Sequence, residues 1–96
     1  MFTPPKNPTV APLNPLSRAA GEAWEAASDA ALAAKAAAGL AYHALLRDWT
    51  PENMAAYRAA NEQEVATWAA VDAAYGRWMM VLEQENAAAN CTRIAA

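Results

Sequence analysis

The large side chains of residues 51–88 recur alternately three and four residues apart, as they do on one face of a helix that packs against another helix. The members of this stripe are Met54, Tyr57, Asn61, Glu64, Trp68, Val71, Tyr75, Trp78 and Leu82. Nearly every large side chain of the segment lies on it. The pattern therefore predicts one long helix, about 51–88, with a coiled-coil-like contact face.

A second stripe with the same spacing runs through residues 15–48 and predicts another long helix. Its members are Trp24, Ser28, Ala31, Lys35, Ala38, Tyr42, Leu45 and Trp49. Charged residues gather on the far side of this helix, as in an amphipathic helix, whereas Leu32 and Leu40 fall off the stripe.

Two helix-start signals divide the chain. Asn14 precedes Pro15, and Thr50 precedes Pro51. Asparagine and threonine cap free backbone amides, and proline suits the first helical position. Because the second signal directly follows the first helix, the connection is short, and short connections join antiparallel helices. The sequence thus predicts an all-α fold, a long antiparallel two-helix hairpin.

Folding the chain back at Pro51 brings the two stripes together. Trp24 then meets Trp78, Tyr42 meets Asn61, Ala31 meets Val71 and Lys35 falls near Glu64. Large side chains mostly face small ones, which allows close packing. We interpret Lys35 and Glu64 as an ion pair that sets the register. The alternative, in which a buried lysine acts as a nucleophile, requires a pocket that two helices do not provide.

Residues 1–14 are rich in proline and predict an extended arm, and residues 91–96 are expected to form a C-terminal tail. The reverse face of the second helix carries a flat strip of alanines followed by Met80 and Val81. Trp49, beside the turn, is expected to be partly exposed. The candidate partner-binding residues are therefore Phe2, Val10, Leu13, Trp49, Met80 and Val81.

Composition limits what such a hairpin can do. Alanine makes up about three in ten residues, far above ordinary usage, so helix is strongly favoured but the core is thin. The net charge of −3 lacks the basic stripe of a nucleic-acid binder. No apolar run is long enough for a membrane span. A small scaffold of this kind usually needs an additional partner surface.

The chemistry-bearing residues are sparse. His43 and Cys91 are the only histidine and cysteine, and spacing places neither beside a catalytic partner. No carboxylate and histidine stand three or four residues apart as a helical metal pair would. We therefore expect no catalytic, cofactor-binding or metal site, no small-molecule substrate and no enzymatic activity.

The leading functional hypothesis is a non-enzymatic structural or assembly subunit that acts through protein–protein contacts, with a protein partner or with further copies of itself. The alternative is a small inhibitor or regulator, of an anti-defence type, that docks on a larger enzyme or nucleoprotein complex. The alanine-rich composition favours a bacterial or phage origin. The segment Met1–Pro8 has no apolar stretch typical of a secretory signal, so we expect a location in the cytoplasm, a phage particle or a host cell.

The hairpin also resembles the small WXG-type helical hairpins of bacteria in length and outline. Its turn reads Trp49-Thr50-Pro51 instead of Trp-x-Gly, and Tyr75 is followed four residues on by Met79 instead of an acidic residue. Nothing known of that family is therefore transferred to this chain.

Overall fold

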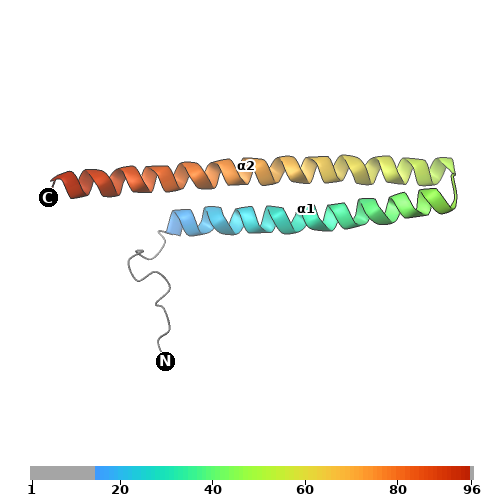
Figure 1. Ribbon diagram of the computed structural model, residues 1–96, viewed down its shortest axis with the longest axis horizontal. Helices are drawn as coiled ribbons and strands as arrows, with labels where there is room; N and C mark the ends of the chain where they lie inside the picture. Colours follow the sequence, from blue (N-terminus) through green and yellow to red (C-terminus); the bar gives the residue numbers. More distant parts are fainter. Residues whose placement is uncertain (1–14, 96) are drawn as a thin grey trace, which may run out of the picture.

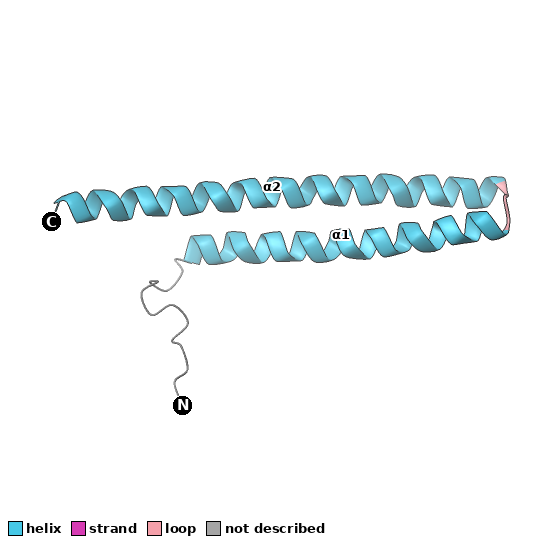
Figure 2. Ribbon diagram, viewed as in Figure 1, coloured by secondary structure: helices cyan, strands magenta, loops and turns pink. Residues whose placement is uncertain are grey.

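The computed structural model describes residues 15–95, with side chains through residue 90, and consists of two long helices joined by a short turn (Figure 1). α1 spans Pro15–Arg47 and α2 spans Pro51–Ala95. The helices lie side by side and antiparallel, and the described segment contains no strand (Figure 2). The predicted all-α hairpin is confirmed. Residues 1–14, with the candidate contacts Phe2, Val10 and Leu13, lie outside the described residues.

Both helices begin at the prolines that the capping signals indicate. α1 ends at Arg47, whereas α2 continues to Ala95, past residue 88 and through most of the segment expected to be a tail. The continuation has a simple cause, because residues 87–89 are alanines and no glycine or proline follows them. With 45 residues against 33, α2 is the longer helix, and it measures roughly 68 Å at about 1.5 Å per residue.

The turn at Asp48–Thr50 is held by the side chains of Thr50 and Asn53, at the start of α2. Thr50 Oγ1 accepts a hydrogen bond of 3.1 Å from the backbone N–H of Asn53, which caps α2. Asn53 Nδ2 donates to the backbone oxygen of Asp48 at 2.8 Å and to that of Ala44 at 3.4 Å. The first turn of α2 therefore satisfies carbonyl groups at the end of α1, and the two helix ends are fastened to each other.

Substituting Thr50→Ala is expected to lower the free energy of unfolding by about 1 kcal/mol, since the cap of α2 loses its acceptor. Urea denaturation followed by circular dichroism measures the loss. Thr67→Ala is the matched control, because the Thr67 hydroxyl donates to the Glu64 carbonyl within α2 and caps no helix end. An equal loss in both variants would show that the Thr50 cap does not stabilise the hairpin.

The register of the two helices follows the predicted pairing at the open end. Trp24 stacks on Trp78 with ring centroids 5.5 Å apart and an interplanar angle of 30°. Ala31 and Val71, also predicted to meet, are both buried. The stack shows the predicted register at the open end, whereas nearer the turn the ring of Tyr42 contacts that of Tyr57, one helical turn before its predicted partner Asn61.

The rotation of each helix about its own axis differs from the prediction. Most of the buried hydrophobic residues in the described segment are alanines: the set is Ala20, Ala31, Ala34, Ala38, Leu45, Val71 and Ala74. Several residues expected at the centre of the contact lie at its edge instead, namely Lys35, Tyr42, Asn61, Trp68 and Tyr75, which are all exposed. The physical reason is that two helices can approach most closely where both carry methyl side chains. The alanines therefore take the centre of the contact, and the large side chains lie to one side of it.

Trp78 shows how a large side chain fits beside such a narrow contact. A Cβ atom added at Gly21 would lie 3.2 Å from Trp78 Cε2 and 3.3 Å from Cζ2. The indole therefore lies directly against the α1 backbone at a position without a side chain. Gly21, which costs helix stability by itself, provides the space in which Trp78 reaches Trp24.

Candidate interaction surface

The displaced large side chains gather on one side of the hairpin, which we call the aromatic face. It receives residues from both helices: Trp24, Leu32, Lys35 and Tyr42 from α1, and Tyr57, Asn61, Val65, Trp68, Tyr75 and Trp78 from α2. Trp68 is 39 % exposed, Tyr75 49 % and Val65 64 %. These side chains are apolar enough to favour a covered environment, yet the described residues cover them only in part.

Ring contacts across the helix pair hold this face together. Trp24 lies 6.4 Å from Tyr75 at 58°, in addition to its stack on Trp78. Further along, the rings of Tyr42 and Tyr57 are 5.6 Å apart at 48°. These tilted and offset geometries are the favourable ones for aromatic pairs. The face is thus a preformed surface built on two rigid helices.

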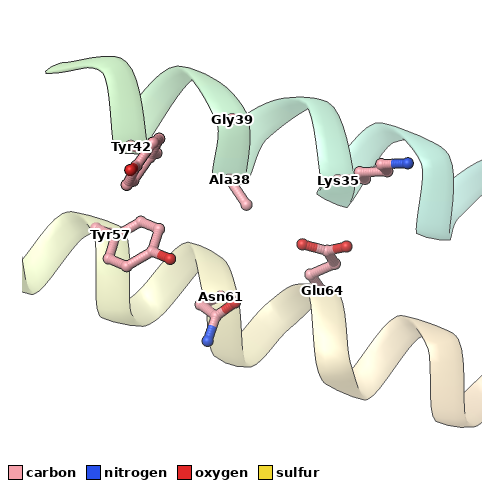
Figure 3. A pocket seen from close by; sticks show the side chains of 7 residues that line it. All are labelled: Lys35, Ala38, Gly39, Tyr42, Tyr57, Asn61 and Glu64. Atoms are coloured by element: carbon pink, nitrogen blue, oxygen red, sulfur yellow. The ribbon is translucent and has the colours of Figure 1, made fainter. Parts of the chain in front are cut away.

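A hollow of about 270 Å³ opens in the middle of the aromatic face. Tyr42 and Tyr57 close one end, and Lys35 and Glu64 stand at the other, as Figure 3 shows. The hollow exists because α1 offers only Ala38 and Gly39 between these larger groups. It has the size to accept one large side chain of a partner.

The predicted Lys35–Glu64 ion pair is wrong. The two residues line the same hollow, but Glu64 Oε2 accepts a hydrogen bond of 3.2 Å from Trp68 Nε1 on its own helix. Lys35 is exposed, and its side chain runs along α1 instead of toward the Glu64 carboxylate (Figure 3). Because the helix rotation places Lys35 at the edge, water solvates its ammonium group and a direct pair gains little.

The sequence-predicted contact residues that the structure describes are scattered. Trp49 is 67 % exposed at the turn, as its position predicts. Met80 is 58 % exposed and Val81 is half-buried, both on α2. Their role in binding stays a prediction.

Sequence reasoning missed the aromatic face because it assigned Trp68 and Tyr75 to the core. One signal for it was present. Leu32 falls off the predicted stripe of its helix, and Val65 stands three residues before Trp68 and is also off its stripe. Leu32 and Val65 thus widen the apolar stripe of each helix toward one side. The aromatic face lies on that side.

The remaining candidates for chemistry are isolated. His43 is exposed, and its ring lies 6.1 Å from that of Tyr42. Within residues 15–90 no three histidine, cysteine, aspartate or glutamate side chains are grouped as metal ligands. Neither helix has a stretch of the length and apolarity needed to cross a membrane within the described residues.

Comparison with known proteins identifies no relative of this chain. The chain matches no family model, and it has no significant similarity to any curated protein or any solved structure. The class that the fold defines is an antiparallel helical hairpin with one aromatic side.

Proposed function

We propose that this chain is a non-enzymatic assembly subunit whose aromatic face makes a protein–protein contact. The observation that supports this most is the row of large exposed side chains along both helices: Leu32, Tyr42, Val65, Trp68 and Tyr75. Tryptophan and tyrosine dominate the energetics of protein interfaces, and clusters of this kind on one face are typical of binding surfaces.

The thin core gives a second reason. Five of the seven buried hydrophobic residues in the described segment are alanines, which remove little apolar area from water. Fully covering one large apolar side chain contributes about 1.5–3 kcal/mol, so a partner on the aromatic face would add more than the alanines can. Binding of a partner to the aromatic face would thus also stabilise the hairpin.

The shape of the face favours a protein over a small molecule. The hollow is only one feature of a surface that extends over several helical turns, from Tyr42 to Tyr75, and its rim carries both a lysine and a glutamate. A long surface with a central recess and a charged rim matches the anatomy of a protein interface.

The test is a charge placed on this face. Val65→Lys should abolish association, whereas Ala70→Lys should retain it, because Ala70 is exposed and lies about 140° around α2 from Val65, away from the side that carries Trp68. Association is read by native mass spectrometry and light scattering of the purified chain and by affinity capture with the same variants. One stoichiometric enzyme that binds in a Val65-dependent manner would favour the inhibitor alternative. A compact monomer that shows no Val65-dependent association of either kind would contradict the proposal.

A further inference from the structure

We propose that the aromatic face is occupied by a second copy of this chain, with the two α2 helices antiparallel and a two-fold axis beside Val65. This inference rests on the proposed function and names its partner. The order of charged, apolar and aromatic side chains along α2 supports it. When a second α2 runs in the opposite direction, basic residues of one copy come opposite acidic residues of the other.

The row of α2 residues that borders the aromatic face and includes Val65 carries this complementarity most clearly. Arg58, Val65 and Asp72 are all exposed and stand seven residues apart, which is two helical turns or about 10.5 Å per interval. An antiparallel copy centred on Val65 places Arg58 opposite the partner's Asp72 and Asp72 opposite the partner's Arg58. A two-fold interface repeats each contact, so the arrangement gains two ion pairs flanking an apolar centre.

The neighbouring row of α2, which contains Asn61, Trp68 and Tyr75, fits the same two-fold axis. With the axis at Val65, Trp68 is within about one residue of the level of the partner's Asn61, where the hollow opens. Tyr75 is within about one residue of the level of the partner's Met54, a half-buried side chain. Each large ring therefore meets a recess or a flexible side chain instead of another ring, which is the alternation that close packing requires.

The two charges at the hollow also find partners in this arrangement. Lys35 and Glu64 lie within about one helical turn of the level of Val65, so both copies of each converge around the axis. The cluster contains two ammonium groups and two carboxylates, and it supplies the acidic neighbours that Lys35 does not contact within its own described chain. Pairing of this kind offsets the cost of covering the charges.

The available area agrees with a stable dimer. Centred on Val65, two hairpins overlap over about 40 Å of their length and about 20 Å of width, or roughly 800 Å² on each copy, which is the size of a standard specific interface. A parallel arrangement would set α1 of one copy over α2 of the other. Arg58 and Asp72 would then face no opposite charge, so the antiparallel form is favoured.

The first experiment tests the axis by cross-linking. Val65→Cys in a Cys91→Ser background should form an intersubunit disulfide on mild oxidation, because two cysteines beside a two-fold axis meet disulfide geometry. Ala69→Cys in the same background is the matched control, since two cysteines at position 69 would lie about 12 Å apart along the helix axes in the proposed register. We expect at least about tenfold faster cross-linking of the Val65 variant. Equal rates for the two variants would overturn the proposed register.

The second experiment reverses the charges. Arg58→Asp and Asp72→Arg should each weaken dimerisation by about tenfold in sedimentation equilibrium, since each sets like charges opposite one another. The double variant should restore the affinity, with helicity by circular dichroism unchanged throughout. A double variant as weak as the single ones would refute the pairing. A monomeric wild-type chain that still binds another protein in a Val65-dependent manner would refute the dimer and leave the proposed function standing.

Discussion

Trp78→Ala is expected to lower the free energy of unfolding by about 3 kcal/mol, within the usual range for truncating a large aromatic side chain. Trp78 stacks on Trp24 and lies against the backbone at Gly21, so it is the main large contact at the open end of the hairpin. Its Nε1 is buried without an acceptor, so the loss comes from packing and not from a hydrogen bond. The alanines nearby cannot fill the cavity.

Urea denaturation followed by circular dichroism, repeated at several protein concentrations, measures this loss. Trp49→Ala is the matched control, since Trp49 is an exposed indole at the turn. Its loss should stay below about 0.5 kcal/mol, as for most surface substitutions. Comparable losses for the two tryptophans would mean that the Trp24–Trp78 stack does not hold the helices together.

Ala31→Leu is the second large effect, an expected loss of about 2–3 kcal/mol from overpacking. Ala31 is 0 % exposed, and Val71, its predicted partner on α2, is also buried. A larger side chain there has no free volume, so it either adopts a strained rotamer or moves the helices apart. The usual expectation that a bigger apolar residue improves a thin core is reversed at this position.

The matched control is Ala33→Leu, an exposed position two residues further along α1. Urea denaturation followed by circular dichroism measures both variants, and the free energy of unfolding of Ala33→Leu should remain within about 0.5 kcal/mol of the wild type. If Ala31→Leu stabilised the chain instead, the helices would have to be farther apart than the structure places them.

The parts of the fold that sequence predicted depend on strong local signals. In the pairs Asn14-Pro15 and Thr50-Pro51 a capping residue precedes a proline, the order typical of a helix start, and the two helices begin at these prolines. The register at the open end followed because the short turn at Asp48–Thr50 leaves little freedom, and Trp24 therefore meets Trp78.

The rotation of the helices could not be read in the same way. A hydrophobic pattern gives weight to large residues, so it placed Tyr42, Trp68 and Tyr75 at the centre of the contact. Alanine occurs on every side of both helices and carries little such signal, yet it allows the closest approach of two backbones. The rotation of each helix depended on how closely the two helix axes can approach. That distance is a property of the pair, and neither helix sequence shows it alone.

The candidate surface was missed for the same reason, since residues assigned to the core could not also be assigned to an interface. Exposure at Trp49 was predictable because a residue beside a tight turn has few neighbours. The failed Lys35–Glu64 pair shows the limit of matching heights along two helices: residues can be level and still point to different sides.

The unequal lengths of the two helices have a mechanical consequence for the proposed dimer. α2 continues past the start of α1 to Ala95, as Figure 1 shows. In an antiparallel pair centred on Val65, the two Ala95 residues would point in opposite directions, each about 30 residues from the axis, and would be separated by roughly 90 Å. Such an assembly would act as a rigid spacer, with its two identical tips held at a fixed separation by the pitch of the α-helix.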